Sequence, residues 1–329
     1  MTATWTKLMA LPDLQRSSQC LTVIGSNAYI YGGELQPRHP VDANVNIVDL
    51  QSDHASIDTI TPTSDTAPPR VGSASAALGY NMYMFSGRGG LQMAPIEEHG
   101  MLWVLETFRR EWTRLWPSDT KAAYPEGRSY HAMASDGDNT IYVHAGCPEK
   151  GRLADLWAFN INNKAWKRLA DAPAPSRGGS SIAFSGGHLY RMNGFDGNTE
   201  QGGALDSYDP STDTWTTISY SPDGKAGPIA RSVCSLQALN VAGKPSLVTF
   251  FGESNPSNLG HAGAGKMLSD IWLFDIQSQE WHAVEASGQT PPARGWFDAD
   301  VVPGRSVIVV TGGLAESNVR LDDLWRLEF

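Results

Sequence analysis

Hydrophobic residues in this chain gather in short segments in which apolar and polar positions alternate, separated by turns rich in Gly, Pro, Asn and Asp. Alternation with a period of two is typical of a strand that buries one face. The segments have the length of strands, and the longest falls far short of the roughly 20 apolar residues that cross a bilayer. The pattern therefore predicts an all-β fold that makes no contact with a membrane.

The alternating segments recur with a period of about 50 residues, which is the spacing of kelch repeats. Each repeat opens with an arginine and small residues, continues into an apolar strand, and ends that strand in a small residue and a glycine. An Asp-x-Trp type of strand and a last strand with a Trp complete the repeat. The opening arginines are Arg16, Arg70, Arg128, Arg177, Arg231 and Arg294. Six such repeats predict a six-bladed kelch β-propeller.

The two ends of the chain complement each other. The sixth repeat stops at Phe329 after its third strand, whereas Thr4–Leu8 reads as a fourth strand with no repeat before it. The N-terminal strand is therefore expected to close the last blade and to cover a sheet edge that would otherwise invite aggregation. The first repeat lacks its Trp, and Asp53–Ile57 occupies that place. We expect one kelch propeller domain over residues 1–329.

Composition narrows the partners and the compartment. The formal charge of −10 repels phosphate backbones, so we expect no nucleic acid partner. Three scattered cysteines, Cys20, Cys147 and Cys234, do not suggest a disulfide framework, and the N-terminus shows no secretory pattern. These features predict a protein of the reducing cytoplasm.

Blade topology predicts which face carries function. In an antiparallel meander, the loop between the second and third strands emerges on the same face as the connection between repeats. The second-strand glycines are followed by Glu34, Arg88, Cys147, Phe195, Glu253 and Leu314. Tyr130 and Trp296 follow two of the opening arginines. We expect Glu34, Phe195, Tyr130 and Trp296 to contact a substrate on this face.

The opening arginines leave two interpretations. Arg128, Arg177, Arg231 and Arg294 are candidate substrate contacts, and the alternative is a network of ion pairs with acidic residues that ties the blades together. The loops 89–101 and 254–269 are long and should carry binding work. Within the first of them, Glu97–His99 is expected to form a solvated lid.

Several local motifs are more specific than a generic kelch repeat. They include Gly87-Arg88, Arg128-Ser-Tyr-His131, Arg177-Gly-Gly, Gly194-Phe-Asp-Gly197 and Arg294-Gly-Trp296. Over essentially every repeat the chain resembles the plant specifier proteins of glucosinolate breakdown (nitrile-specifier, epithiospecifier and thiocyanate-forming proteins) and their fungal kelch relatives. The resemblance implies that Arg88 holds an anionic substrate and that Trp296 lies beside it.

The resemblance also implies a ferrous ion held by Glu, Asp and His at intervals of four residues. Glu253 and His261 match the first and third ligands, but Ser257 stands at the position of the Asp. A hydroxyl is a weak ligand for a divalent ion, so we expect no tightly bound metal and no other cofactor, with Fe(II) held by Glu253 and His261 as the alternative. Glu253 and His261 then become candidates for general base and acid, and Arg88 for the anchor of an anionic group.

Three functions remain open from the sequence. The first is a specialised-metabolism enzyme of the lyase, isomerase or cyclase type, which rearranges a small reactive substrate. The second is an iron-dependent specifier-like protein that acts on glucosinolate aglycones. The third is a scaffold that binds a partner protein, since many kelch propellers do so, and the fold alone does not decide among them.

Overall fold

The computed structural model describes residues 1–51 and 56–329. The chain divides into two compact units, the first formed by Ser18–Gly178 and the second by Met1–Ser17 together with Gly179–Phe329. Each unit is described by itself below. That residues 1–329 act as one domain stays a prediction.

Three antiparallel four-stranded sheets, the blades, build the first unit. Blade one contains β2 (Ser17–Ile24), β3 (Asn27–Gln36), β5 (Val45–Asp49) and β6 (Asp58–Ile60), and β4 (His39–Pro40) pairs with β3. Blade two contains β7 (Ala74–Leu78), β8 (Asn81–Phe85), β11 (Leu102–Glu106) and β12 (Glu111–Leu115). Blade three contains β13 (Ala132–Ser135), β14 (Thr140–Gly146), β15 (Leu153–Asn160) and β16 (Ala165–Leu169). The sequence placed the outer strand of blade one at Asp53–Ile57, whereas the observed strand β6 begins at Asp58. Residues 53–55 lie outside the described residues.

The second unit repeats the same architecture. Blade four contains β17 (Ser181–Ser185), β18 (His188–Met192), β19 (Ala204–Asp209) and β20 (Thr214–Ser219). Blade five contains β21 (Ser235–Val241), β22 (Lys244–Phe250), β25 (Ile271–Asp275) and β26 (Glu280–Ala283). Blade six contains β29 (Asp298–Val301), β30 (Val307–Thr311), β32 (Asp323–Glu328) and β1 (Thr2–Ala10). The described residues thus form the six four-stranded blades of a β-propeller, as the repeat predicts.

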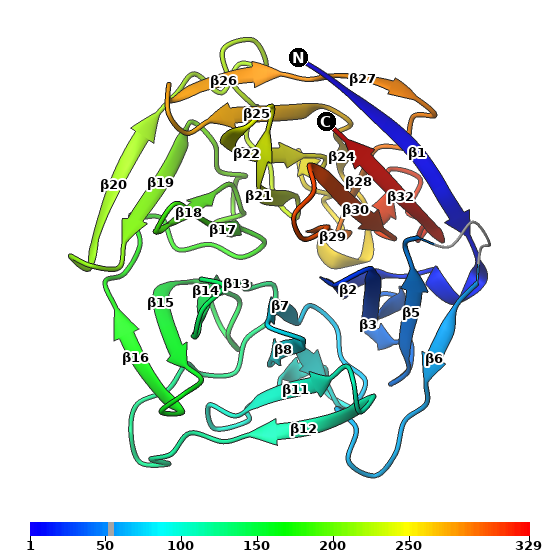
Figure 1. The fold of residues 1–329 in the computed structure, drawn as a ribbon, viewed down its shortest axis with the longest axis vertical. Helices are drawn as coiled ribbons and strands as arrows, with labels where there is room; N and C mark the ends of the chain where they lie inside the picture. The colour runs from blue at the N-terminus through cyan, green and yellow to red at the C-terminus, as the bar shows by residue number, and fades with distance from the viewer. Residues whose placement is uncertain (52–55) are drawn as a thin grey trace. The chain divides into compact units, whose positions relative to one another are not determined.

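The N-terminal strand completes the last blade, which confirms the prediction made for Thr4–Leu8. Figure 1 shows β1 between β32 and β27 (Glu285–Gly288). It pairs with β32 in antiparallel register from Thr4 opposite Glu328 to Ala10 opposite Asp323, and with β27 in parallel register. The outer edge of β32 is therefore covered by backbone hydrogen bonds.

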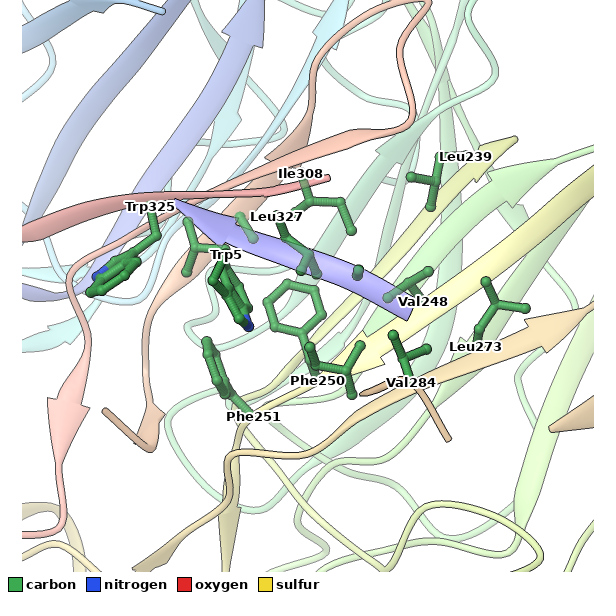
Figure 2. Packing of buried hydrophobic residues seen from close by; sticks show 14 of the residues in the cluster. Trp5, Leu239, Val248, Phe250, Phe251, Leu273, Val284, Ile308, Trp325 and Leu327 are labelled. Atoms are coloured by element: carbon green, nitrogen blue, oxygen red, sulfur yellow. The ribbon is translucent and has the colours of Figure 1, made fainter. Parts of the chain in front are cut away.

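Trp5 anchors this strand in the core between blades five and six. Its ring stacks on Phe251 with centroids 5.6 Å apart and meets Trp325 edge-on at 6.4 Å. Figure 2 shows Trp5 above Phe250 and Phe251, with Trp325 and Leu327 of β32 on the same side. Large aromatic areas of this kind dominate core energetics.

The opening arginines are buried, and Arg70, Arg128, Arg231 and Arg294 bind carboxylates of their own blade. Arg128 is fully buried and donates from Nη1 to Asp155 Oδ1 at 2.6 Å and from Nη2 to Oδ2 at 2.9 Å. Arg231 and Arg294 form the same two-pronged pairs, with Asp270 and Asp323 respectively. Two parallel charge-assisted hydrogen bonds fix both the geometry and the partner, so these arginines support the ion-pair interpretation.

Blade two uses a glutamate in the same role. Arg70 donates to both carboxylate oxygens of Glu98, at 3.1 and 3.0 Å. Trp103 donates its indole N–H to the same carboxylate at 2.7 Å, and only 9% of the Glu98 side chain is exposed. The expectation that Glu97–His99 is a solvated lid is therefore wrong for Glu98, which belongs to the frame of the blade.

Within each unit, glycine amides bind the carbonyls of the opening arginines. Every second strand ends in a pair of residues with positive φ, such as Phe251 at 56° and Gly252 at 100°. The amide of the second residue in the pair donates to the carbonyl of an opening arginine, as Gly252 does to Arg294 at 2.8 Å and Gly146 to Arg177 at 3.0 Å. A Cβ on Gly252 would lie 2.8 Å from the Ser232 carbonyl oxygen, so the left-handed backbone and the close approach both require glycine.

Blade four departs from this pattern. Leu205 pairs with Met192 in the register at which Leu156 pairs with His144 in blade three, so Ala204 stands where Asp155 stands. Asp206 instead binds the buried Arg191 at 2.7 Å. The sequence Asp206-Ser-Tyr208 has the form of the Asp-x-Trp motif, but the observed register places Asp206 two residues further along the strand than Asp155.

Removal of the carboxylate from one frame pair should be costly. We expect Asp323→Ala to lower the free energy of unfolding by about 3–5 kcal/mol, because Arg294 then remains buried without its counter-charge. Lys244→Ala is the control, since Lys244 pairs with Asp275 at 3.0 Å while 60% of its side chain is exposed. That loss should stay below about 1 kcal/mol in the same chemical denaturation experiment. Equal losses in the two variants would contradict the structural role of the arginine.

Candidate functional site

Backbone pairing brings the two predicted sets of residues side by side. After four of the opening arginines, the next residue pairs with the residue that follows a second-strand glycine, as Ser129 does with Cys147 and Ser232 with Glu253. The hydrogen bonds between Ser232 and Glu253 run in both directions at 2.9 Å. The prediction that the two sets share one face is thus confirmed within these blades.

The next residue along has a left-handed backbone in every repeat. These residues are Ser18, Gly72, Tyr130, Gly179, Val233 and Trp296, with φ between 46° and 63°. Within the second unit, Val233 donates its N–H to Gly179 at 2.9 Å and Trp296 donates to Val233 at 3.1 Å. Left-handed backbone is a genuine outlier for a β-branched residue such as Val233, and the flanking bridge and hydrogen bonds hold it there.

The four arginines predicted to contact substrate form hydrogen bonds within the protein instead. The guanidinium groups of Arg128, Arg231 and Arg294 are fully buried on carboxylates and also donate to the carbonyls of Ala145, Phe251 and Gly312. Arg177 is buried as well and donates from Nε to the Pro175 carbonyl at 3.1 Å. Since a ligand would have to displace these bonds, we leave the four arginines out of the proposed binding set.

Arg88 differs from the opening arginines because its hydrogen bonds within the protein use only some of its five N–H donors. It is half-buried and donates from Nε to Ser129 at 2.8 Å, from Nη1 to the Met93 carbonyl at 3.1 Å and from Nη2 to the Pro148 carbonyl at 3.2 Å. A guanidinium carries five N–H donors. Three contacts therefore fix its orientation and leave donors for an anionic group.

Glu34 and Tyr130 lie in the same unit as Arg88. Glu34 is buried and accepts the Arg38 N–H at 2.7 Å. Tyr130 is half-buried, and its hydroxyl lies 3.4 Å from that of Ser18. Burial and the nearby Glu34 raise the pKa of Tyr130 well above its ordinary value. Tyr130 therefore stays a neutral phenol that can donate a hydrogen bond.

Glu253 is a buried carboxyl group of the second unit with a raised pKa. It lies on β23 (Glu253–Ser254), which pairs with β24 (Lys266–Met267), and it is 4% exposed. Its Oε1 accepts the Gly265 N–H at 2.6 Å. Burial raises the pKa of Glu253 to about 7, and the neighbouring Glu200 adds to the shift while the Gly265 hydrogen bond opposes it. A carboxyl group that titrates near neutrality can both accept and return a proton.

Glu200 is the functional candidate that the sequence did not indicate. It ends the short loop that begins after Gly194, where it forms a bridge with Phe195, and its Oε1 is buried with no hydrogen-bond partner. Burial raises the pKa of Glu200, although nearby backbone N–H groups oppose the shift. Nothing in the spacing of the repeat marks this residue, because its proximity to Glu253 arises only when blades four and five are folded.

Phe195 and Trp296 are half-buried residues of the same unit. Phe195 lies across the loop from Glu200, and Trp296 follows Gly295, whose Cα faces the backbone N of Glu253 and the Val233 side chain. Both remain predicted substrate contacts, because an aromatic face near a buried carboxyl group can hold an apolar part of a ligand.

The iron ligands implied by the resemblance do not assemble into a site. His261 lies on the short helix η2 (Gly260–Ala262), and the Ser257 hydroxyl accepts the Leu259 N–H at 3.1 Å within the same loop. Among the described residues, no group of three or more His, Cys, Asp or Glu is placed to hold a metal ion. The expectation of no tightly bound metal, and its alternative of Fe(II) held by Glu253 and His261, both stay predictions.

Six four-stranded blades with this arginine frame define a kelch-type β-propeller. The chain belongs to the kelch-repeat family, since the model of the KLHDC2/KLHL20/DRC7 Kelch-repeats domain matches residues 18–252. The solved structure of YjhT superimposes with a TM-score of 0.72 over 96% of this chain and 95% of that one, at 15% identity, and so supports the fold alone.

Two curated relatives differ in how much of them the chain spans. It is 27% identical to N-(sulfonatooxy)prop-2-enimidothioate sulfolyase of Thlaspi arvense over 94% of this chain and 91% of that protein. It is also 27% identical to Adagio protein 3 of Arabidopsis thaliana, over 75% of this chain but only 39% of that protein. The specifier-type resemblance thus extends nearly end to end.

Membrane contact and compartment were also predicted from the sequence. Within residues 1–51 and 56–329, no helix has the length and apolar character needed to span a bilayer. The cytoplasmic location stays a prediction.

Glu253 should make stability depend on pH. Its pKa is about 7 in the folded chain against 4.5 for the ordinary group, so the native state binds the proton more tightly. The resulting stabilisation is complete below about pH 4.5 and is lost as pH rises through about 7, a change of about 3 kcal/mol. Glu253→Gln should lack this loss in denaturation series at pH 5 and pH 8, whereas the exposed Glu285→Gln should retain it. A wild-type and Glu253→Gln difference that is the same at both pH values would contradict the prediction.

Proposed function

We propose that this chain is an enzyme of specialised metabolism that acts on a small reactive molecule by proton transfer at Glu253, without a tightly bound metal. The observation that carries the proposal is a single buried carboxyl group, 4% exposed, whose pKa of about 7 suits it to both halves of a proton transfer. The end-to-end similarity to a sulfolyase supports an enzyme over other kelch functions.

The chemistry open to Glu253 is that of a lyase, an isomerase or a cyclase. As a carboxylate it accepts a proton from the substrate, and in an elimination the electron pair of the breaking bond departs with the leaving anion. In an isomerisation or cyclisation the resulting carboxylic acid returns the proton to another atom. His261, eight residues further along the same loop, is proposed as a second acid or base.

The substrate class is proposed from the relative. The Thlaspi arvense enzyme is named for a substrate with a sulfonatooxy group, which is an anion. A small molecule that carries such a group is therefore the first substrate class to test.

The test supplies N-(sulfonatooxy)prop-2-enimidothioate, released from its glucosinolate by myrosinase, and measures sulfate and organic products by mass spectrometry. We expect the protein to change the product distribution in the presence of a chelator, and Glu253→Gln to reduce the new product by about 100-fold or more. Glu285→Gln serves as the matched control. Full product formation by Glu253→Gln would rule out proton transfer at this residue, and activity that needs added Fe(II) would favour the iron-dependent alternative.

A second candidate, a protein-binding scaffold, is favoured by one surface feature. The rings of Tyr80 and Phe108 pack with centroids 4.9 Å apart at two turns of blade two, and they are 63% and 80% exposed. Exposed aromatic pairs are typical of interface anchors. Under this alternative a partner would be captured by the wild type and lost in Phe108→Ala.

A further inference from the structure

The segment 255–265, called the flap below, leaves blade five through a narrow neck. It begins after β23 and ends before β24, and these two strands pair with each other. A Cβ on Gly265 would clash with the Asn255 carbonyl oxygen, so the two ends of the flap lie in contact. A short loop with close ends that packs on itself is an Ω-loop, and such loops frequently carry function.

The interior of the flap is held by its own hydrogen bonds. The Gly260 N–H donates to the Ser257 carbonyl at 2.9 Å, and the Gly263 N–H donates to the Gly260 carbonyl at 3.1 Å. The Ser257 hydroxyl accepts the Leu259 N–H, and a Cβ on Gly263 would clash with this hydroxyl. Because these contacts lie within the flap, they are kept when the flap moves relative to the blade.

The C-terminal end of the flap lies directly against the carboxyl group of Glu253. The Gly265 N–H donates to Oε1 at 2.6 Å, and a Cβ on Gly265 would lie 2.6 Å from the same oxygen. Glu253 is 4% exposed in this arrangement. A substrate that exchanges a proton with Glu253 has to come within hydrogen-bonding distance of its carboxyl group. The flap must therefore move before the proposed reaction can occur.

Asn318, in the loop of blade six, contacts the flap from outside. Its Nδ2 donates to the Ala262 carbonyl at 3.2 Å, and this hydrogen bond is exposed. The apolar side chains of the two loops bury little area, since Leu259 is 74% and Val319 52% exposed. One exposed hydrogen bond contributes only modestly to stability, so it can break and re-form while the blade stays folded.

We propose that the flap is a gate over Glu253 and that the side-chain amide of Asn318 is its latch. With the latch made, Gly265 covers the carboxyl group. With the latch broken, the flap turns about its two ends, where Asn255 has a left-handed backbone with φ of 54° and Gly265 lacks a side chain, and a small substrate reaches the carboxyl group. The gate rests on the proposed function for its purpose, whereas the flap and the latch can be measured without a substrate.

The first measurement is hydrogen exchange at the Gly265 amide, followed by NMR on the full chain. Asn318 has a φ of 63°, so Asn318→Gly keeps the left-handed turn and removes the latch. Exchange at Gly265 should then accelerate about threefold to tenfold, the change expected for the loss of one hydrogen bond. Ser317→Gly is the matched control, because Ser317 is exposed on the same turn and the variant keeps the latch.

The Gly252 amide, which binds the Arg294 carbonyl in the frame of the blades, should exchange at an unchanged rate in both variants. An unchanged rate at Gly265 in Asn318→Gly would overturn the latch, and so would an equal acceleration at Gly252.

The second measurement tests access to Glu253 itself. A carbodiimide and glycine ethyl ester label carboxyl groups, and mass spectrometry gives the rate at Glu253, with the exposed Glu285 as internal reference. Asn318→Gly should raise this rate by the same factor as the exchange at Gly265. A short bismaleimide cross-link in the double variant Ala262→Cys and Asn318→Cys should suppress it. Each single cysteine variant, treated with the same reagent, controls for reaction at other thiols. Labelling of Glu253 that the cross-link leaves unaffected would refute the gate.

Both readouts separate the flap from the proposed function. Faster exchange and labelling in Asn318→Gly, together with full product formation by Glu253→Gln, would support the gate and reject the proposed function. Unchanged exchange and labelling, together with loss of product in Glu253→Gln, would do the reverse.

Discussion

A single backbone hydrogen bond, repeated from blade to blade, governs much of this structure. The amide after the small residue at the end of each second strand donates to the carbonyl of an opening arginine, which Gly33 does to Arg70 and Gly313 to Arg16. This bond requires two consecutive left-handed residues, so the strand must turn sharply at that point. In four blades the guanidinium of the arginine then binds a carboxylate on the third strand or in the segment just before it. These buried arginines and carboxylates therefore stabilise the blades rather than bind a ligand.

The same constraint places the functional residues. Because the strand turns at the glycine, the following residue is carried into a bridge with the segment after an opening arginine, and Arg88, Cys147 and Glu253 all occupy this position. Their backbones are fixed by ladder-like hydrogen bonds while their side chains vary between repeats. The same backbone geometry therefore carries an arginine, a cysteine or a glutamate side chain in different repeats. Burial raises the pKa of both Cys147 and Glu253, which shows how strongly this position is desolvated.

The sequence predicted the features that recur in every repeat, but few of the features that are specific to one repeat. The six blades and the closing role of Thr4–Leu8 followed from strand periodicity and from the missing fourth strand of the last repeat. The register of Asp206 does not follow from the motif, because an Asp that precedes an aromatic residue by two positions fits it at either register; in the structure Asp206 pairs with the buried Arg191. Glu200 could not be found, since its significance depends on a contact between two loops more than fifty residues apart.

Ser257 connects the resemblance to the chemistry proposed here. An aspartate at that position would bring a third ionisable ligand to Glu253 and His261, whereas the serine hydroxyl is used locally to accept the Leu259 N–H. Glu253 is buried and accepts one backbone N–H. Its burial and the negative charge of Glu200 raise its pKa and so favour the protonated form, although the backbone N–H opposes this shift. Under the proposed function, the glutamate at this position therefore serves as an acid–base group rather than as a metal ligand.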